Sequence, residues 1–227
     1  MRVLLSAEMN YFAHALPFLD RPYFAAATGI PDWLTVVDRK VRLRSKHVEP
    51  FLEDADPQIA AVAGGVLQHI RDDARFHRSR PFVETSLELT TRARDALGDA
   101  VGLRPAFLGH LLTEVLLDAT LIAENPGGTE KYFGLLESVD PGRIEAAVNR
   151  MAPQTTNRLA SMISHFREAR ILSDYLEDAK LMGRVNQVMH RVKLPEVPDD
   201  FAEFLPAARR LVASRKNELL EGIPTCS

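Results

Sequence analysis

Two stretches of this 227-residue chain carry histidines and acids at a spacing of four residues. The members are His69, Asp73 and His77 in the first stretch and His110, Glu114 and Asp118 in the second. Four residues advance an α-helix by about 40° around its axis, so each set would form a slanted stripe on one helix face. Imidazole nitrogens and carboxylate oxygens are ligands of Mn²⁺, Fe²⁺ and Zn²⁺, so both stripes indicate metal binding. Neighbouring members of a set can share an ion, whereas the outer members, about 12 Å apart, cannot. A complete set therefore predicts two metal ions, or one metal ion and a residue that contacts substrate.

The first stripe coincides with the apolar face of its helix. On a helical wheel Asp73 and His77 fall within about 80° of His69. The same sector carries the apolar side chains Val62, Val66, Ile70 and Phe76. The opposite sector is polar and is expected to face solvent; it carries Gln68, Arg71, Asp72, Arg75 and Arg78. The three titratable side chains of the stripe are therefore predicted to point toward the core.

The second stripe lies on a helix that is apolar nearly all round, which predicts a central position in the fold. Burying a carboxylate costs several kcal/mol unless it is paired or coordinated to a cation. A single pair of this type is more often a solvated helix face, but two sets on two core helices favour a metal. The alternative is that Arg71 or Arg75 bridges to the acids of another helix.

The elements that must position these residues are helices. Helical periodicity dominates, and only 36–43 is weakly extended. The expected helices are 17–28, 57–79, 81–98, 104–124, 128–138, 141–151, 155–174, 176–192 and 199–221. Without repeats or low-complexity segments, the chain is predicted to be all-α, a single-domain helical bundle over 1–227. Residues 9–124 would form the metal-site core, and the helices of 125–227 would pack on it.

Composition narrows the class of protein further. A net charge of −3 argues against a nucleic-acid partner. The single cysteine, Cys226, excludes a disulfide framework and a CxxC metal site. The apolar stretches are interrupted within about ten residues, and the N-terminus lacks the apolar run of a signal peptide. We therefore expect a cytoplasmic protein with no membrane partner; the sequence leaves the oligomeric state open.

Two further residues and one basic run join the candidate site. His14 follows the apolar segment that begins at Met9, and Asp32 stands before Trp33 in a predicted tight turn that could aim its carboxylate inward. The alternatives are a satisfied core histidine and a helix N-cap. The run 39–47 carries five cations, which are either solvated surface or a steering patch for an anionic ligand.

These residues resemble the acyl carrier protein phosphodiesterases over about 9–118. The matching segments are Met9-Asn-Tyr-Phe-Ala-His14, Gly29-Ile-Pro-Asp32, Gly65-Val-Leu-Gln-His-Ile-Arg-Asp-Asp-Ala-Arg-Phe-His77 and Gly109-His-Leu-Leu-Thr-Glu-Val-Leu-Leu-Asp118. The family is helical and related to the HD-domain phosphohydrolases. Its members use a divalent metal, typically manganese, to cleave the phosphodiester between 4′-phosphopantetheine and a carrier-protein serine. The resemblance implies an HD-domain-like fold, although Asp118-Ala119 replaces an Asp-His pair of the family.

In this resemblance His14 matches the N-terminal histidine of the family, Asp32 its early aspartate, and His69 with Asp73 its central His-x-x-x-Asp. The implied function is metal-dependent hydrolysis of a phosphodiester. The expected ligands are His69, Asp73, His110 and Glu114, with Asp32 as ligand or bridge. His14 or His77 would contact the phosphate or a second metal, and Asp118 would orient a ligand histidine. Manganese is the expected ion, with iron and zinc as alternatives.

The expected partners are a phosphorylated small molecule or an acidic carrier protein. The cations that would steer them are Arg39, Lys40, Arg42 and Arg44. One alternative is a non-catalytic or redox metal protein, although the Glu-x-x-His motif of di-iron bundles is missing from the sequence. The other is a helical protein-interaction domain whose buried acids pair with arginine.

Overall fold

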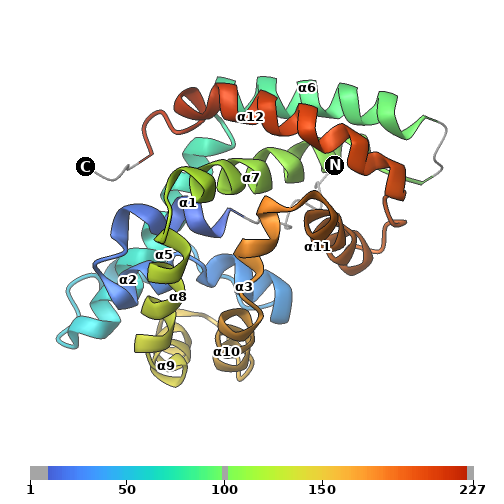
Figure 1. The fold of residues 1–227 in the computed structure, drawn as a ribbon. Helices are drawn as coiled ribbons and strands as arrows, with labels where there is room; N and C mark the ends of the chain where they lie inside the picture. The colour runs from blue at the N-terminus through green and yellow to red at the C-terminus, as the bar shows by residue number, and fades with distance from the viewer. Residues whose placement is uncertain (1–9, 99–101, 224–227) are drawn as a thin grey trace. The chain divides into compact units, whose positions relative to one another are not determined.

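The computed structural model describes residues 10–98 and 102–223, and over these ranges the chain forms helices and no strand (Figure 1). The all-α prediction is thereby confirmed. The chain divides into two compact units. Among the described residues, unit 1 contains Asn10, 76–98, 102–126 and Ile171–Gly222, and unit 2 contains Tyr11–Arg75, Gly127–Arg170 and Ile223. Met9 and Cys226 lie outside the described residues.

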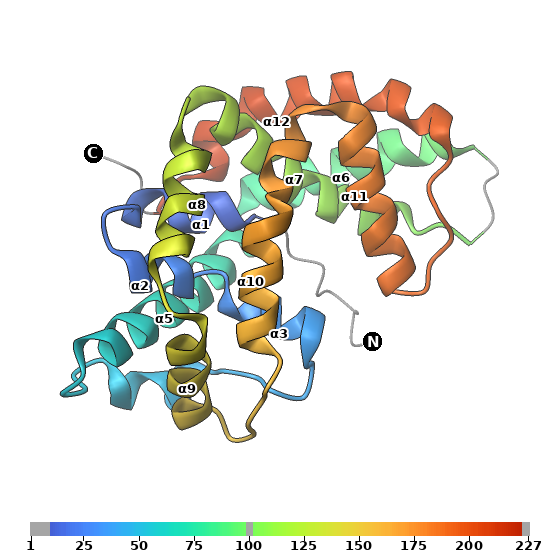
Figure 2. The same cartoon turned by 60° about the horizontal axis from the view of Figure 1, so that its bottom comes forward.

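Unit 1 is built around α7. Its elements are α6 (Arg80–Leu97), α7 (Pro105–Glu124), the 3-10 helix η3 (Ile171–Leu176), α11 (Asp178–Arg191), η4 (Asp199–Phe204) and α12 (Leu205–Leu219). Helices α6 and α12 both pack against α7, and Figures 1 and 2 show the three side by side. Gly109 allows the close approach of α6, because a Cβ there would lie 2.3 Å from Thr90 Oγ1 and 2.5 Å from the Ser86 carbonyl oxygen.

Helix α7 is the core helix that its sequence predicts. Its apolar side chains are almost all buried, as are Glu114 and Asp118. Length and composition alone would allow α7 to cross a membrane, but 72% of its most apolar window is buried inside the structure. A core helix of a globular unit has these same properties, so α7 is weak evidence for a membrane span.

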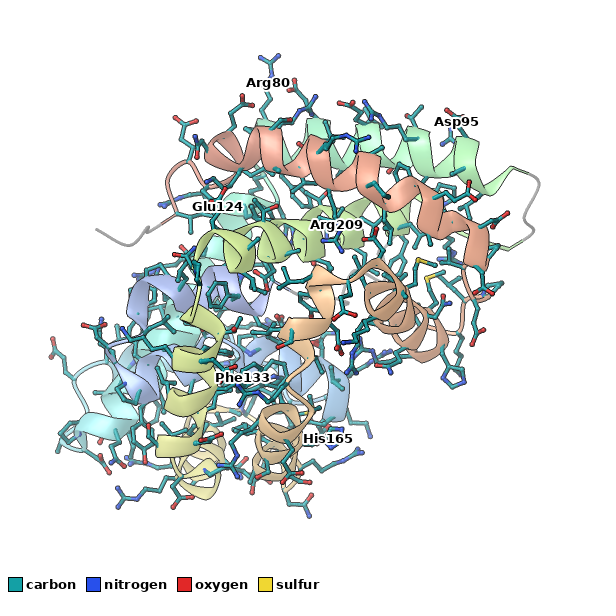
Figure 3. All side chains as sticks on the ribbon, in the orientation of Figure 1. Arg80, Asp95, Glu124, Phe133, His165 and Arg209 are labelled. Atoms are coloured by element: carbon teal, nitrogen blue, oxygen red, sulfur yellow. The ribbon has the colours of Figure 1, made fainter. Side chains whose placement is uncertain are left out.

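Unit 2 surrounds an aromatic core. Its elements are α1 (Tyr11–Ala15), η1 (Leu16–Phe18), α2 (Pro22–Ala27), α3 (Ile30–Val37), α4 (Ser45–Val48), η2 (Glu49–Phe51), α5 (Pro57–Phe76), α8 (Gly128–Ser138), α9 (Pro141–Met151) and α10 (Leu159–Ala169). Helix α10 packs against α3, α8 and α9. Its Phe166 ring contacts Tyr11 and Trp33 edge-on, with centroids 4.8 and 5.2 Å apart. Phe133 adds a further ring between α8 and α10 (Figure 3).

Helices that are marked in the sequence by capping residues, prolines or glycines begin and end where the sequence predicts. The predicted ranges 128–138 and 141–151 match α8 and α9 residue for residue. Asp140 caps α9 by accepting a hydrogen bond from the Gly142 amide at 2.8 Å, and Pro141 fits the first helical position. Ser79 caps α6 in the same way, accepting from the Phe82 amide.

The N-terminal prediction is less accurate. The expected helix 17–28 is broken into η1 and α2, because Pro22 starts a new helix. The segment 36–43 contains no strand, since Val37 ends α3 and an irregular connection follows. Asp32 is not in a tight turn: it lies in the first turn of α3, where Pro31 opens the helix.

Candidate metal centres

Unit 2 holds the first group of potential ligands, here called the His69 group: His14, His69 and Asp73. Each offers one ligand atom, and these atoms all lie within 4.8 Å of one another. Helix α1 supplies His14, while α5 supplies His69 and Asp73 one turn apart. The two imidazole rings lie 4.4 Å apart between centroids. Both histidines are buried and Asp73 is half-buried, so the predicted inward orientation of His69 is confirmed.

His14 is the residue of this group that most needs a ligand. Its side chain is buried, and neither ring nitrogen has a hydrogen-bond partner in the described part of the chain. Its Nδ1 lies 3.9 Å from Asp72 Oδ2, which is too far for a hydrogen bond. A buried polar group without a partner costs free energy, and coordination to an ion would recover it.

Asp32 reaches the same place from α3. Its Oδ1 lies 3.6 Å from His69 Nε2, and the carboxylate is buried next to Trp33. The structure therefore brings Asp32 beside His69, although the residue comes from the first turn of a helix and not from the predicted tight turn.

Asp72 lies next to the His69 group, beside His14. The sequence did not predict it there, because the helical wheel places it on the solvent face. The structure buries it. Gln68, one turn earlier on α5, donates its side-chain amide to both carboxylate oxygens at 2.9 Å. The Gln68-Asp72 spacing of four residues was the available signal, because such pairs interact along a helix.

Unit 1 holds the second group, here called the Glu114 group: His77, His110 and Glu114. His77 Nε2 lies 2.7 Å and His110 Nε2 3.0 Å from the same carboxylate oxygen, Glu114 Oε1. Glu114 is 0% exposed, whereas the side chains of His77 and His110 are 21% and 16% exposed. Helix α7 presents His110 and Glu114 one turn apart, and His77 directly follows the last residue of α5.

The Glu114 carboxyl stays ionised in this environment. Burial alone would raise its pKa, but the hydrogen bonds to His110 and His77, with the positive charge of those rings when protonated, outweigh burial and lower the pKa below its usual value. The group is therefore a buried negative charge faced by two imidazoles.

The remaining predicted residues lie outside both groups. Asp118 is fully buried on α7, one turn beyond Glu114, and its expected role in orienting a ligand histidine stays a prediction. The predicted steering cations are all exposed and connect α3 to α4; they are Arg39, Lys40, Arg42 and Arg44. Arg39 and Arg42 donate to the backbone carbonyls of Thr35 and Arg39, each at 3.3 Å.

The structure places the predicted ligands in two groups. His69 and Asp73 join His14 in unit 2, while His110 and Glu114 join His77 in unit 1. His14 and His77, expected to contact phosphate or a second metal, each lie in one of the two groups of potential ligand atoms.

No protein-family model, curated protein or solved structure matches this chain. The fold and the two groups define the class of the protein: an all-α protein with two groups of histidine and carboxylate ligands that could hold metal ions.

Proposed function

We propose that this chain is a metal-dependent phosphoesterase that hydrolyses a phosphodiester with an ion held by the His69 group. The observation that carries the proposal is the convergence of two buried histidines and a carboxylate, with neither ring nitrogen of His14 hydrogen-bonded to any described residue. The resemblance to the acyl carrier protein phosphodiesterases and their HD-domain-like relatives narrows the substrate to phosphopantetheine on an acidic carrier protein or a related phosphodiester.

The residues of the His69 group fit a divalent cation. His14 and His69 can supply imidazole nitrogens, and the half-buried Asp73 with the buried Asp32 can supply carboxylate oxygens. A divalent ion balances two carboxylates, and mixed nitrogen and oxygen ligands suit Mn²⁺, Fe²⁺ or Zn²⁺ better than Ca²⁺. We take Mn²⁺ as the first candidate because of the resemblance.

When bound, such an ion polarises a phosphoryl oxygen and lowers the pKa of coordinated water. The protein residues do the positioning. His14, His69 and Asp73 hold their ligand atoms together from two helices. Asp32, 3.6 Å from His69, adds a carboxylate that can supply a further ligand oxygen or accept a proton from the attacking water.

We assign substrate capture to the exposed cations of the α3 to α4 connection. None of the four forms an ion pair within the described residues, so their charge is available to an anionic ligand. They lie in the same unit as the His69 group. Such a patch raises the association rate of an acidic protein or a phosphorylated molecule, and salt weakens the effect.

The test combines metal analysis with hydrolysis of bis-p-nitrophenyl phosphate in the presence of Mn²⁺. Bound metal and hydrolysis that His69→Ala or Asp73→Ala abolishes support the proposal. The matched controls are His165→Ala and Asp95→Ala, which remove exposed residues (Figure 3) and should leave the rate unchanged.

Other outcomes identify the alternatives. Metal without hydrolysis favours a non-catalytic metal protein. A metal-free chain whose melting temperature ignores Mn²⁺ refutes the proposal and favours an interaction domain. Release of phosphopantetheine from a carrier protein is the narrower test of the substrate.

A further inference from the structure

The Glu114 group has a geometry that hydrolysis at the His69 group does not require. Two imidazole nitrogens from separate segments point at one carboxylate oxygen, at 2.7 and 3.0 Å. We propose that His77, His110 and Glu114 bind a transition-metal ion of their own, of the Zn²⁺, Co²⁺ or Fe²⁺ class, with coordination positions left open to solvent. This site goes beyond the proposed function, since its occupancy needs neither the His69 group nor a phosphodiester substrate.

The separations between the ligand atoms suit one ion. Metal bonds of about 2.0–2.2 Å place neighbouring ligand atoms roughly 3.0–3.4 Å apart, depending on the coordination angle. The observed 2.7 Å is a few tenths of an ångström shorter than this range, 3.0 Å lies at its lower end, and all three ligand atoms lie within 4.8 Å of one another. Small side-chain rotations therefore suffice to admit an ion.

A divalent cation suits the buried carboxylate of this group. Glu114 is fully buried and accepts hydrogen bonds from His77 and His110. An ionised carboxylate is costly to bury, and coordination to a cation is one of the arrangements that offset this cost. A divalent ion between the three side chains would add positive charge and use the same imidazole nitrogens as ligands.

The group is held in place by its surroundings. The Phe82 ring packs edge-on against both imidazoles, with centroids 4.8 Å from His77 and 5.0 Å from His110. The partial exposure of both histidines leaves a route for the ion from solvent. Fixed rings and an open approach are what a preorganised site needs.

Two histidines and one carboxylate determine the class of ion and what completes the site. This ligand set binds Zn²⁺ in hydrolases and Fe²⁺ in oxygenases, and in both cases leaves positions open. Water or an anionic oxygen ligand, such as a carboxylate or phosphate, would occupy them. Mg²⁺ is disfavoured because it prefers oxygen ligands and retains its waters.

The test measures ion stoichiometry in the full-length chain after removal of metals with a chelator. Zn²⁺ is added, free ion is removed by dialysis, and bound zinc is counted; Co²⁺ absorption reports the ligand field. Glu114→Gln keeps the shape of the side chain and removes its charge. His77→Gln is the second variant because His77 is partly exposed and lies outside the helices, so its replacement should not prevent folding.

We expect about two Zn²⁺ ions in the wild type and about one in Glu114→Gln, His77→Gln and His69→Ala, with at least about a 100-fold loss of affinity at the altered site. The matched control, Glu124→Gln, replaces a more exposed glutamate of the same helix and should keep both ions. Circular dichroism verifies that each variant is folded.

The proposal is overturned if the wild type binds no ion, or if Glu114→Gln and His77→Gln retain as many ions as the wild type. It is also overturned if the wild type binds two ions and a folded Glu114→Gln chain binds none, because the two groups would then not be filled separately. One ion in the wild type and none in Glu114→Gln would leave this site standing and show that the His69 group is empty. Two bound ions without phosphodiester hydrolysis would refute the proposed function and leave this site standing.

Discussion

Gly109 is where the packing of unit 1 is most sensitive to a single methyl group. A Cβ at this position would lie 2.3 Å from Thr90 Oγ1, 2.5 Å from the Ser86 carbonyl oxygen and 2.7 Å from the Thr90 amide nitrogen. Ordinary contact begins near 3.4 Å, so the shortfall is about 1 Å. Two of the three atoms belong to the backbone of α6 and cannot rotate away, so Gly109→Ala must force α6 from α7.

The cost follows from two opposing effects. Overpacking of a tight core costs about 1–3 kcal/mol and more when the backbone must move. Alanine has a higher helix propensity than glycine, which offsets up to about 1 kcal/mol of this loss. We take the overpacking cost near the upper end of its range, so the free energy of unfolding should fall by about 2 kcal/mol. For a chain of this size this loss corresponds to a fall in melting temperature of about 4–8 °C.

Urea unfolding followed by circular dichroism measures this change, and Gly134→Ala is the matched control. Gly134 also lies in a helix, α8, but its added Cβ would meet no atom within 4 Å. The control should therefore gain up to about 1 kcal/mol. If Gly109→Ala is as stable as the wild type, the close approach of α6 and α7 is wrong. Because α6 also carries Phe82, the variant should bind metal more weakly at the Glu114 group.

Three further predictions concern the sites. Asp72→Asn should weaken Mn²⁺ binding in titration calorimetry by about 10–100-fold, because it removes a buried carboxylate charge 3.9 Å from His14 Nδ1 that favours a cation in the group; unchanged affinity would exclude this role. In the metal-free protein, the lowered pKa of Glu114 contributes stability above about pH 4.3, the pKa of unfolded glutamate, and this contribution is lost as the pH falls through the lower folded value. Urea midpoints in chelator should show that loss in the wild type, and Glu114→Gln should flatten it. Arg42→Glu combined with Arg44→Glu should raise KM for an acidic carrier protein about tenfold at low salt and leave the rate with bis-p-nitrophenyl phosphate unchanged; an equal KM would refute steering.

The sequence predicts the helices well where start and stop signals are local. Asp140-Pro141 and Ser79 with Pro81 mark helix starts that the structure confirms, because a cap and a proline act within one turn. The helix α3 was missed because its eight residues are too few to show a helical period, and its burial depends on Phe166 from a distant part of the chain. Contacts between distant parts of the chain do not appear in the local periodicity of apolar residues.

The same distinction applies to the sites. Spacing along α5 and α7 identified His69, Asp73, His110 and Glu114, since each pair lies one turn apart on a single helix. It could not determine which histidine completes each group, because His14 and His77 come from other segments. A helical wheel also treats each helix as having one buried side, whereas Asp72 is buried on the side that the wheel assigned to solvent.

Each group contains side chains from two separate segments of the chain, and a bound ion would link those segments. In unit 2 an ion would connect α1 to α5, and in unit 1 it would connect the residue after α5 to α7. An ion that binds only the folded chain stabilises it by about 2.7 kcal/mol at a free concentration of 100 times Kd. That contribution compensates for burying carboxylates and imidazoles where apolar side chains would pack at lower cost. The stability of each unit should therefore depend on its own group, so metal removal should lower the unfolding free energy in two separable steps.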